Sequence, residues 1–196
     1  MAWDFGGLAM TPEVVFVRHA RVADRYQGVC YGRSDVPLGP EGVEESRRLA
    51  ERLSRLPIRH LVSSGAARTR VLAEQIAERT GLEIVVEPAL LERDFGTWEL
   101  RTWEAIYEEV GDAMQGLIRE PDTYRPPGGE TTNELRDRAL SWYARRPTGG
   151  LVVVVTHGGP IAAIRGSLAG KRPVDWVGLI PRPGSFVGLT AGGDSA

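Results

Sequence analysis

The sequence predicts an α/β fold, arranged as a three-layer α/β/α sandwich with a mostly parallel central sheet. The first observation behind this prediction is a set of short apolar runs rich in β-branched residues, which are typical of buried strands. The expected strands are 13–17, 58–62, 83–86, 151–155 and 185–190. The second observation is that segments with helical apolar spacing separate most of these runs. Strands that alternate with helices indicate a sheet covered on both faces.

The helices are predicted from apolar spacing and from residues that favour helix ends. They are expected to begin near Pro40, Ala66 and Pro160, and a mostly helical stretch covers 100–142 with a break at 124–129. Proline is favoured in the first turn of a helix, which supports starts at Pro40 and Pro160. The first helix is expected to carry Leu56 on its inner face, and Gly81 is a typical stop for the second.

Length and composition limit the class of protein. With 196 residues, of which 42% are hydrophobic, we expect one domain over 12–192, a loose leader over 1–11 and a frayed tail over 191–196. The net charge of −2 points to neither nucleic acid nor membrane as a partner. Cys30 is the single cysteine, so no internal disulfide can form, and a reducing cytoplasm is expected. No stretch is long and apolar enough to cross a membrane, and the N-terminus lacks a signal-peptide pattern.

Two histidines occupy matching places in the chain. His19 directly follows the first apolar run, and His157 follows the run 151–155. In open α/β sheets, ligands bind beyond the carboxyl ends of the strands. Both imidazoles are therefore candidates for one shared site.

Other chemically active side chains are expected at the same edge. Arg18 precedes His19, Arg68 lies in the first turn after the second strand, and Glu92 follows the third strand. Gly158 stands at the mouth of the helix after His157. Two arginines, two histidines and a helix N-terminus suit an anion, and a carboxylate adds a proton donor. This combination favours phosphoryl transfer.

Each of these residues also has a structural interpretation. A histidine at a strand end more often has a packing role, and Arg68 alone would be a solvated helix residue. Asp94 and Glu99 compete with Glu92 for the part of the acid. Four tryptophans are expected to pack rather than to bind a ligand: Trp98, Trp103, Trp142 and Trp176.

Five motifs in order resemble the histidine phosphatase superfamily, in its phosphoglycerate-mutase-like branch. They are Arg18-His19-Ala20; Ser63 and Ser64 followed by Arg68; the pattern Leu-x-Glu-x-x-Phe-Gly-x-Trp-Glu over 90–99; Pro127 to Thr131; and His157-Gly158-Gly159. The resemblance implies that His19 attacks phosphorus and becomes phosphohistidine. It implies that Arg18, Arg68 and His157 hold the phosphoryl oxygens, and that Glu92 protonates the leaving alkoxide and then activates water.

Departures from the family pattern suggest further phosphate contacts and bear on the choice between a phosphatase and a mutase. Arg25 stands where the mutases carry a phosphate-binding asparagine, so Arg25 is a candidate contact, as are Gly32 and Gly158. The segment 28–38, which includes Arg33, resembles a sub-branch with alpha-ribazole phosphatases of cobalamin synthesis. The mutases carry a larger insertion between the acid and the last histidine. The short segment here favours a phosphatase.

We therefore expect a phosphomonoesterase that needs no metal and no other cofactor, because arginines neutralise the phosphoryl charge. Its expected substrate is a small phosphorylated metabolite, with alpha-ribazole 5′-phosphate as the first candidate. The alternatives are a broad sugar or nucleotide phosphatase, a phosphoglycerate mutase and a non-catalytic binder of phosphorylated ligands. The substrate walls should come from 20–37 and 100–130. Apolar surface on the helical middle could support a homodimer.

Overall fold

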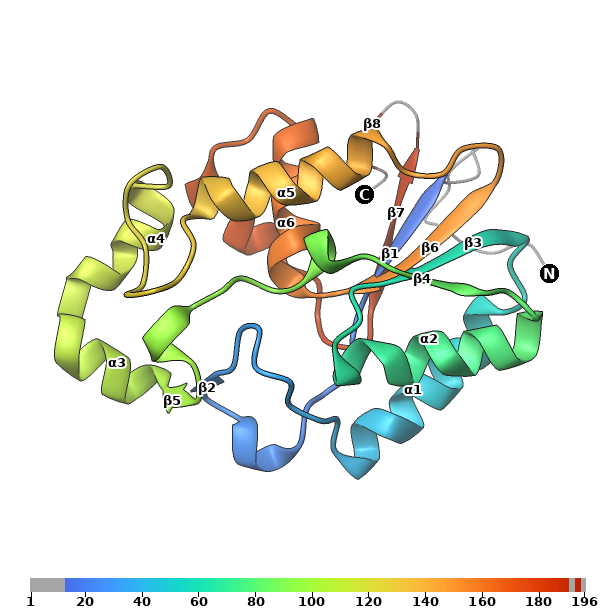
Figure 1. Ribbon diagram of the computed structural model, residues 1–196, viewed down its shortest axis with the longest axis horizontal. Coiled ribbons are helices and arrows are strands. Elements are labelled where there is room, and N and C mark those ends of the chain that lie inside the picture. Colours follow the sequence, from blue (N-terminus) through green and yellow to red (C-terminus); the bar gives the residue numbers. More distant parts are fainter. Residues whose placement is uncertain (1–12, 191–192, 195–196) are drawn as a thin grey trace.

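The computed structural model describes residues 13–190 and 193–194, and its centre is a six-stranded sheet in the order β4-β3-β6-β1-β7-β8 (Figure 1). The strands are β1 Val14–Arg18, β3 Ile58–Ser63, β4 Ile84–Val86, β6 Leu151–Thr156, β7 Phe186–Thr190 and β8 Gly193–Asp194. The first four strands of that order run parallel, and β7 and β8 add antiparallel pairs at one side. The predicted fold class is confirmed.

Helices cover both faces of the sheet. On one face lie α1 Pro40–Leu53 and α2 Ala67–Thr80, and on the other α5 Thr132–Ala144 and α6 Gly158–Leu168 (Figure 1). Side chains alternate across β6, where Val153 and Val155 pack with α1 and α2, and Val152 and Val154 pack with α5 and α6. Because β6 is buried along its whole length, the burial of each valine side chain stabilises the fold by about 1.5 kcal/mol or more.

A smaller region extends beyond the carboxyl edge of the sheet. Its regular elements are β2 Val29–Cys30, β5 Arg101–Thr102, α3 Trp103–Val110 and α4 Gly116–Arg119. Short 3-10 turns complete the described chain: η1 Asp24–Tyr26, η2 Pro88–Leu90, η3 Gly96–Trp98, η4 Gly111–Gln115 and η5 Pro173–Leu179. Cys30, Trp98 and Ile106 form the centre of a separate apolar cluster here. This region therefore has a small core of its own beside the main sheet.

Some sequence expectations need correction. The last helix begins at Gly158 rather than Pro160, because His157 has the extended backbone of an N-cap. Leu56 lies beyond the end of α1, although its side chain is buried as expected. The tail was expected to fray, but Gly193 and Asp194 pair with β7 as β8. The leader 1–11 and residues 191–192 and 195–196 lie outside the described residues.

The parallel strands bring their carboxyl ends to one edge. β6 lies between β1 and β3, with Thr156 paired to Arg18 and Val155 paired to Ser63. The residues that directly follow β1, β3 and β6 therefore start at the same level. No helix in the described part of the chain has the length and apolar character needed to cross a membrane.

Candidate active site

His19 is held rigidly at the carboxyl end of β1. Its backbone N–H donates to the carbonyl of Thr156 at 3.0 Å, and its ring Nδ1 lies 2.7 Å from the carbonyl oxygen of Ala20. A carbonyl only accepts, so Nδ1 carries the proton and Nε2 keeps a free lone pair. Burial, helped by the charge of Arg68, lowers the pKa of His19 from 6.5 to about 3. The ring is therefore a neutral base at physiological pH.

His157 lies beside it, with the two ring centroids 5.3 Å apart. Its Nε2 contacts the Ser64 hydroxyl at 2.8 Å, and the same hydroxyl contacts that of Thr69 at 3.0 Å. Thr69 already donates its proton to the carbonyl of Ala66 at 2.8 Å. Thr69 also accepts from the Ser63 hydroxyl at 3.1 Å. The arrangement that places a hydrogen in every one of these contacts has Ser64 donate to Thr69 and accept from His157 Nε2–H. The other ring nitrogen, Nδ1, is buried without a partner, and burial lowers the pKa of His157 well below 6.5.

Two arginines place buried charge around these rings. Arg68 is fully buried, donates to the carbonyls of Ser34 at 2.9 Å and Gly32 at 2.5 Å, and leaves its Nε without a partner. Arg18 donates to the Pro181 carbonyl at 2.9 Å and also leaves its Nε buried and unpartnered. Burial lowers the pKa of Arg68, and the fields of both arginines lower that of His19. A buried cation with unfilled donors favours an anionic ligand.

Glu92 faces the same space from the segment after η2. One carboxylate oxygen accepts from the backbone N–H of Arg93 at 2.9 Å, and the other from that of Gly159 at 3.2 Å. A Cβ at position 159 would lie 2.2 Å from the Glu92 carboxylate, so glycine makes room for it.

The two competing carboxylates, Asp94 and Glu99, are engaged in other contacts. Asp94 accepts from Gly96 and Arg33, while Glu99 accepts the backbone N–H groups of residues 33, 34 and 95.

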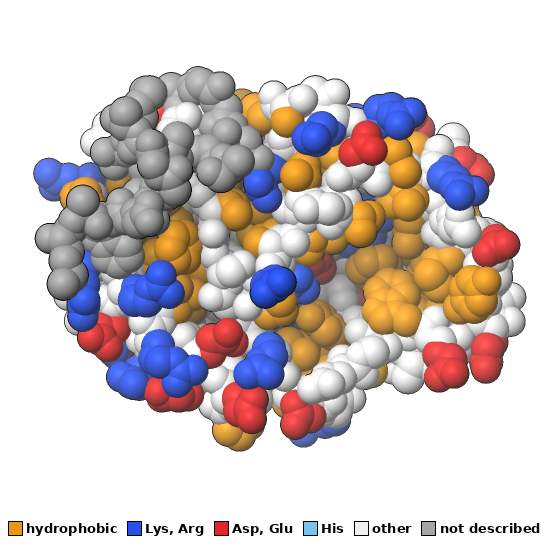
Figure 2. All heavy atoms as spheres, turned by 180° about the vertical axis from the view of Figure 1, so that it is seen from behind, with side chains coloured by type: hydrophobic (Ala, Val, Ile, Leu, Met, Phe, Trp, Pro, Cys, Tyr) orange, Lys and Arg blue, Asp and Glu red, His pale blue; other side chains and the backbone are white. Residues whose placement is uncertain are grey.

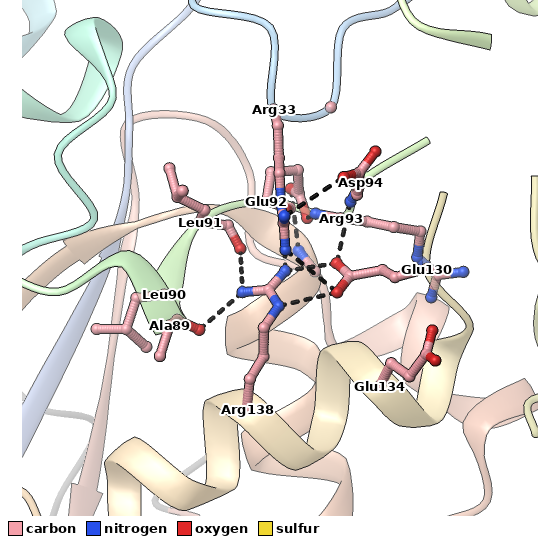
Figure 3. Close-up of polar contacts among 12 residues, drawn as sticks. Arg33, Ala89, Leu90, Leu91, Glu92, Arg93, Asp94, Glu130, Glu134 and Arg138 are labelled. Carbon is pink, nitrogen blue, oxygen red and sulfur yellow. Dashed lines mark hydrogen bonds and ion pairs between the residues drawn. The ribbon is translucent and has the colours of Figure 1, made fainter. Parts of the chain in front are cut away.

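A polar network fixes the backbone that carries Glu92 (Figure 3). Arg138, on α5, donates to the carbonyls of Ala89, Leu91 and Glu92 at 2.7–2.9 Å and pairs with both oxygens of Glu130. Arg138 is not predicted from the sequence, because on its own it resembles any charged residue on a helix surface. Arg33 joins the same network through Asp94 and Glu130, each at 3.3 Å. Its guanidinium is thus engaged with carboxylates.

A cavity of about 570 Å³, here called the inner cavity, opens at this site. Its polar and backbone lining comes from Arg18, Tyr31, Gly32, Glu92, Arg93 and Gly159. Its apolar walls come from Val29, Phe95, Trp103, Met114, Leu117, Ile118, Val177 and Ile180. Figure 2 shows hydrophobic side chains around a hollow on the side of the molecule that carries α3 and α4. The walls thus draw on both segments named from the sequence and, in addition, on η5.

A second cavity of about 470 Å³ is lined by His19 and shares Val29, Tyr31 and Trp103 with the inner cavity. Trp98, Trp142 and Trp176 are buried, and Trp103 packs against the cluster of Cys30, Trp98 and Ile106 as expected. Trp103 also lines both cavities.

Three further candidates can now be placed. Gly32 gives its carbonyl to Arg68, and a Cβ there would collide with Glu99 at 2.3 Å. Gly158 lies against Arg18, where an added Cβ would come within 3.3 Å of the guanidinium carbon. Arg25 is exposed, stacks over Tyr26 at 4.9 Å and is absent from the lining of both cavities. The structure therefore brings the two glycines to the site, but not Arg25.

Cys30 is buried behind this region. Burial, followed by the negative fields of Glu99 and Glu92, raises the pKa of its thiol to about 12. A thiol of that pKa is protonated at neutral pH and makes a poor nucleophile. Within residues 13–190 and 193–194, no group of three or more His, Cys, Asp or Glu side chains is placed to hold a metal ion.

The fold and the site define an α/β protein with a cationic, histidine-bearing pocket at the carboxyl edge of its sheet. The sequence profile of the histidine phosphatase superfamily (branch 1) matches residues 14–195, and the chain belongs to that superfamily. The family recognised from the five motifs is confirmed, and so is the prediction that the chain is an enzyme of the histidine phosphatase type.

The proteins similar to this chain include a probable mutase and two phosphatases. The probable phosphoglycerate mutase GpmB of Salmonella choleraesuis is 32% identical over 161 residues, which cover 81% of this chain and 75% of the relative. A mycobacterial glucosyl-3-phosphoglycerate phosphatase, solved with inorganic phosphate, is 29% identical with a TM-score of 0.78, covering 92% of this chain and 90% of that one. The alpha-ribazole phosphatase of Shigella flexneri has a TM-score of 0.76 at 19% identity, covers 91% of each chain, and supports the fold alone.

Proposed function

We propose that the protein is a metal-independent phosphomonoesterase that works through a phosphohistidine at His19. The observation that carries this proposal concerns buried nitrogens. Among the described residues, four buried side-chain nitrogens lack a hydrogen-bond partner, and three of them belong to Arg18, Arg68 and His157 around the His19 ring. Unfilled buried N–H donors are costly, and two phosphoryl oxygens would accept from the Nε–H groups of Arg18 and Arg68. Nδ1 of the neutral His157 ring carries a lone pair, and the negative charge of the bound phosphoryl group would favour uptake of a proton there, so that Nδ1 then donates to the third oxygen.

The proposed reaction begins at the neutral His19 ring, whose Nε2 carries a free lone pair. Nε2 of His19 bonds to phosphorus while the phosphorus–oxygen ester bond breaks, and Glu92 gives its proton to the leaving alkoxide. Water then gives a proton to Glu92 and bonds to phosphorus while the phosphorus–nitrogen bond breaks, which releases phosphate and restores His19. Arg18, Arg68, His157 and the backbone at Gly158 at the start of α6 hold the oxygens.

The substrate class is a small phosphorylated metabolite. The apolar walls of the inner cavity suit an organic group larger than the phosphate alone. Alpha-ribazole 5′-phosphate, with its aromatic base, is one candidate, and sugar or nucleotide phosphates form the broader alternative. The first experiment is hydrolysis of p-nitrophenyl phosphate and of a phosphometabolite panel, with EDTA present throughout.

The nucleophile has a matched control in this chain. His19→Ala should abolish hydrolysis, whereas His60→Ala should leave it unchanged, because His60 lies on β3 outside both cavities. Full activity in His19→Ala would refute the assignment. Loss of wild-type activity in EDTA would refute independence from metal.

Phosphoglycerate mutase activity is a second candidate, supported by the name of the Salmonella relative. The two functions separate in one assay, with 3-phosphoglycerate and catalytic 2,3-bisphosphoglycerate. A mutase produces 2-phosphoglycerate, while a phosphatase releases inorganic phosphate.

A further inference from the structure

Glu99 is a half-buried carboxylate that the proposed chemistry does not use. All four hydrogen bonds found for it within the described chain come from two short segments. One oxygen accepts from the backbone N–H groups of Arg33 at 2.8 Å and of Phe95 at 3.1 Å. The other accepts from the backbone N–H of Ser34 at 2.7 Å and from the Ser34 hydroxyl at 2.5 Å. The negative charge of Glu99 therefore lies against the loop that precedes α1.

The same loop holds the guanidinium of Arg68. Arg68 donates to the carbonyls of Gly32 at 2.5 Å and Ser34 at 2.9 Å. The carbonyl of Gly32 and the N–H of Arg33 belong to one peptide group, here called the linking peptide. The C=O and N–H of a trans peptide point in opposite directions. The linking peptide therefore lies between the Glu99 carboxylate and the Arg68 guanidinium.

This arrangement couples the two charges without direct contact. A peptide that donates its N–H to a carboxylate has a more negative carbonyl oxygen, which accepts more strongly from a cation. Burial lowers the pKa of Arg68, and Glu99 is among the groups, Glu92 first, whose negative fields oppose that effect. Gly32 has a φ of +38°, and a Cβ there would lie 2.3 Å from the Glu99 carboxylate. Glycine thus permits the close approach of the carboxylate to the linking peptide.

The contacts of Arg68 leave one donor for a ligand. Each terminal nitrogen of its guanidinium is engaged by a carbonyl, whereas Nε is buried without a partner. The backbone of Arg68 is fixed independently, because Asp35 accepts from the Ala67 N–H at 2.6 Å in the first turn of α2. Loss of the Glu99 charge should therefore release the guanidinium and leave α2 in place.

We propose that Glu99 is a positioning residue that acts through the linking peptide and holds the Arg68 guanidinium where its Nε–H meets the transferring phosphoryl group. This proposal rests on the proposed phosphatase function. Glu99 itself is engaged by the loop and is absent from the lining of both cavities. Its effect on turnover must therefore pass through Arg68.

A double-mutant cycle tests this, because a residue that acts only through Arg68 loses its effect when Arg68 is replaced. The measurement is kcat/KM for p-nitrophenyl phosphate in the wild type, Glu99→Gln, Arg68→Met and the double variant. Glutamine keeps the size of the side chain, but its single carbonyl oxygen cannot replace two acceptor oxygens.

We expect Glu99→Gln to lower kcat/KM roughly tenfold to a hundredfold, because a displaced binding group is costly in the transition state. In Arg68→Met, the same change should alter kcat/KM by less than about twofold. No loss in the wild type, or an equal loss in both backgrounds, would overturn the proposal.

Two controls separate this effect from a general disturbance of the fold. Glu99→Gln introduced into Arg18→Met should again cause its full loss, since Arg18 donates to the Pro181 carbonyl and not to the loop that holds Arg68. Loss of the effect in Arg18→Met as well would contradict an action through Arg68 alone. The exposed Glu51→Gln should leave kcat/KM unchanged.

A structural measurement keeps the test independent of the folding of Arg68→Met. Crystals of the wild type and of Glu99→Gln are soaked with tungstate, an oxyanion that stands in for the phosphoryl group. We expect Arg68 Nε within hydrogen-bond distance of a tungstate oxygen in the wild type only. That contact in both proteins, or in neither, would contradict the proposal. Failure of the wild type to hydrolyse any phosphate ester would instead refute the proposed function.

Discussion

The ring Nδ1 of His19 lies 2.7 Å from the carbonyl oxygen of Ala20, whereas His157 uses its Nε2, at 2.8 Å from the Ser64 hydroxyl. The two adjacent rings are thus fixed through opposite nitrogens. Since the Ala20 carbonyl only accepts and the Ser64 proton is used by Thr69, each ring has a defined tautomer. His19 offers a lone pair at Nε2, and His157 has an unpartnered Nδ1.

The first prediction is that the two histidines are neutral and in opposite tautomers in the ligand-free enzyme. Nitrogen-15 shifts of labelled histidine should show His19 protonated at Nδ1 and His157 at Nε2 near neutral pH. His19→Gln and His157→Gln assign the signals. Ser64→Ala should remove the preference of His157 while leaving that of His19 unchanged. Detection of His157 protonated at Nδ1 alone in the wild type would contradict the derived network.

The second prediction concerns stability and pH. Burial lowers the pKa of His19 from 6.5 to about 3, so its contribution to stability is fully present above about pH 6.5 and is lost as pH falls toward 3. Between about pH 6.5 and pH 5, the wild type should lose roughly 2 kcal/mol more unfolding free energy than His19→Gln. Urea denaturation at both values measures the difference. Parallel losses in the two proteins would show that His19 titrates normally.

The third prediction concerns Arg138 as a positioning residue. Arg138→Met leaves the nearly buried Glu130 short of a partner and removes the donors to three carbonyls near Glu92. We expect a loss of about 3 kcal/mol, or roughly 10 °C in Tm. The value of kcat should also fall more for alkyl than for nitrophenyl esters, with little change in KM, because Glu92 shifts. Arg145→Met, at an exposed pair with Glu87, should change stability by about 0.5 kcal/mol or less. A stability loss with an unchanged leaving-group dependence would leave Arg138 with a structural role only.

The sequence predicted the framework well because the framework depends on local patterns. The β-branched run at 151–155 and the glycine after α2 indicate their elements without knowledge of the fold. Because parallel strands end at one edge of a sheet, the sequence also predicted correctly that His19 and His157 lie close together. Arg138 was missed because its importance depends on the acceptors that surround it, and these lie up to 49 residues away along the chain. The short β2–β5 pair was missed because two residues carry no periodic pattern.

The fourth prediction tests Glu92 as the proton donor. Glu92→Gln keeps the shape and one of the two acceptor oxygens, which can still accept from the Gly159 N–H, but it cannot give a proton to an alkoxide. We expect hydrolysis of alkyl phosphates to fall about 100-fold or more, and that of p-nitrophenyl phosphate by less than about tenfold, since nitrophenolate leaves without a proton. Glu104→Gln, exposed on α3, serves as the control. Equal losses for both ester types would remove Glu92 from this role.

The central claim is that phosphorus becomes bonded to His19 during turnover. The most direct measurement mixes Glu92→Gln with a phosphorus-32-labelled phosphomonoester and quenches the reaction rapidly in base. Peptide mapping then locates the label. We expect an acid-labile, base-stable label on the peptide that contains His19. The label should form at the rate at which the product alcohol is released, and it should be absent from His19→Ala. Alcohol release by the wild type without any labelled peptide, or a label on His157 instead, would contradict it.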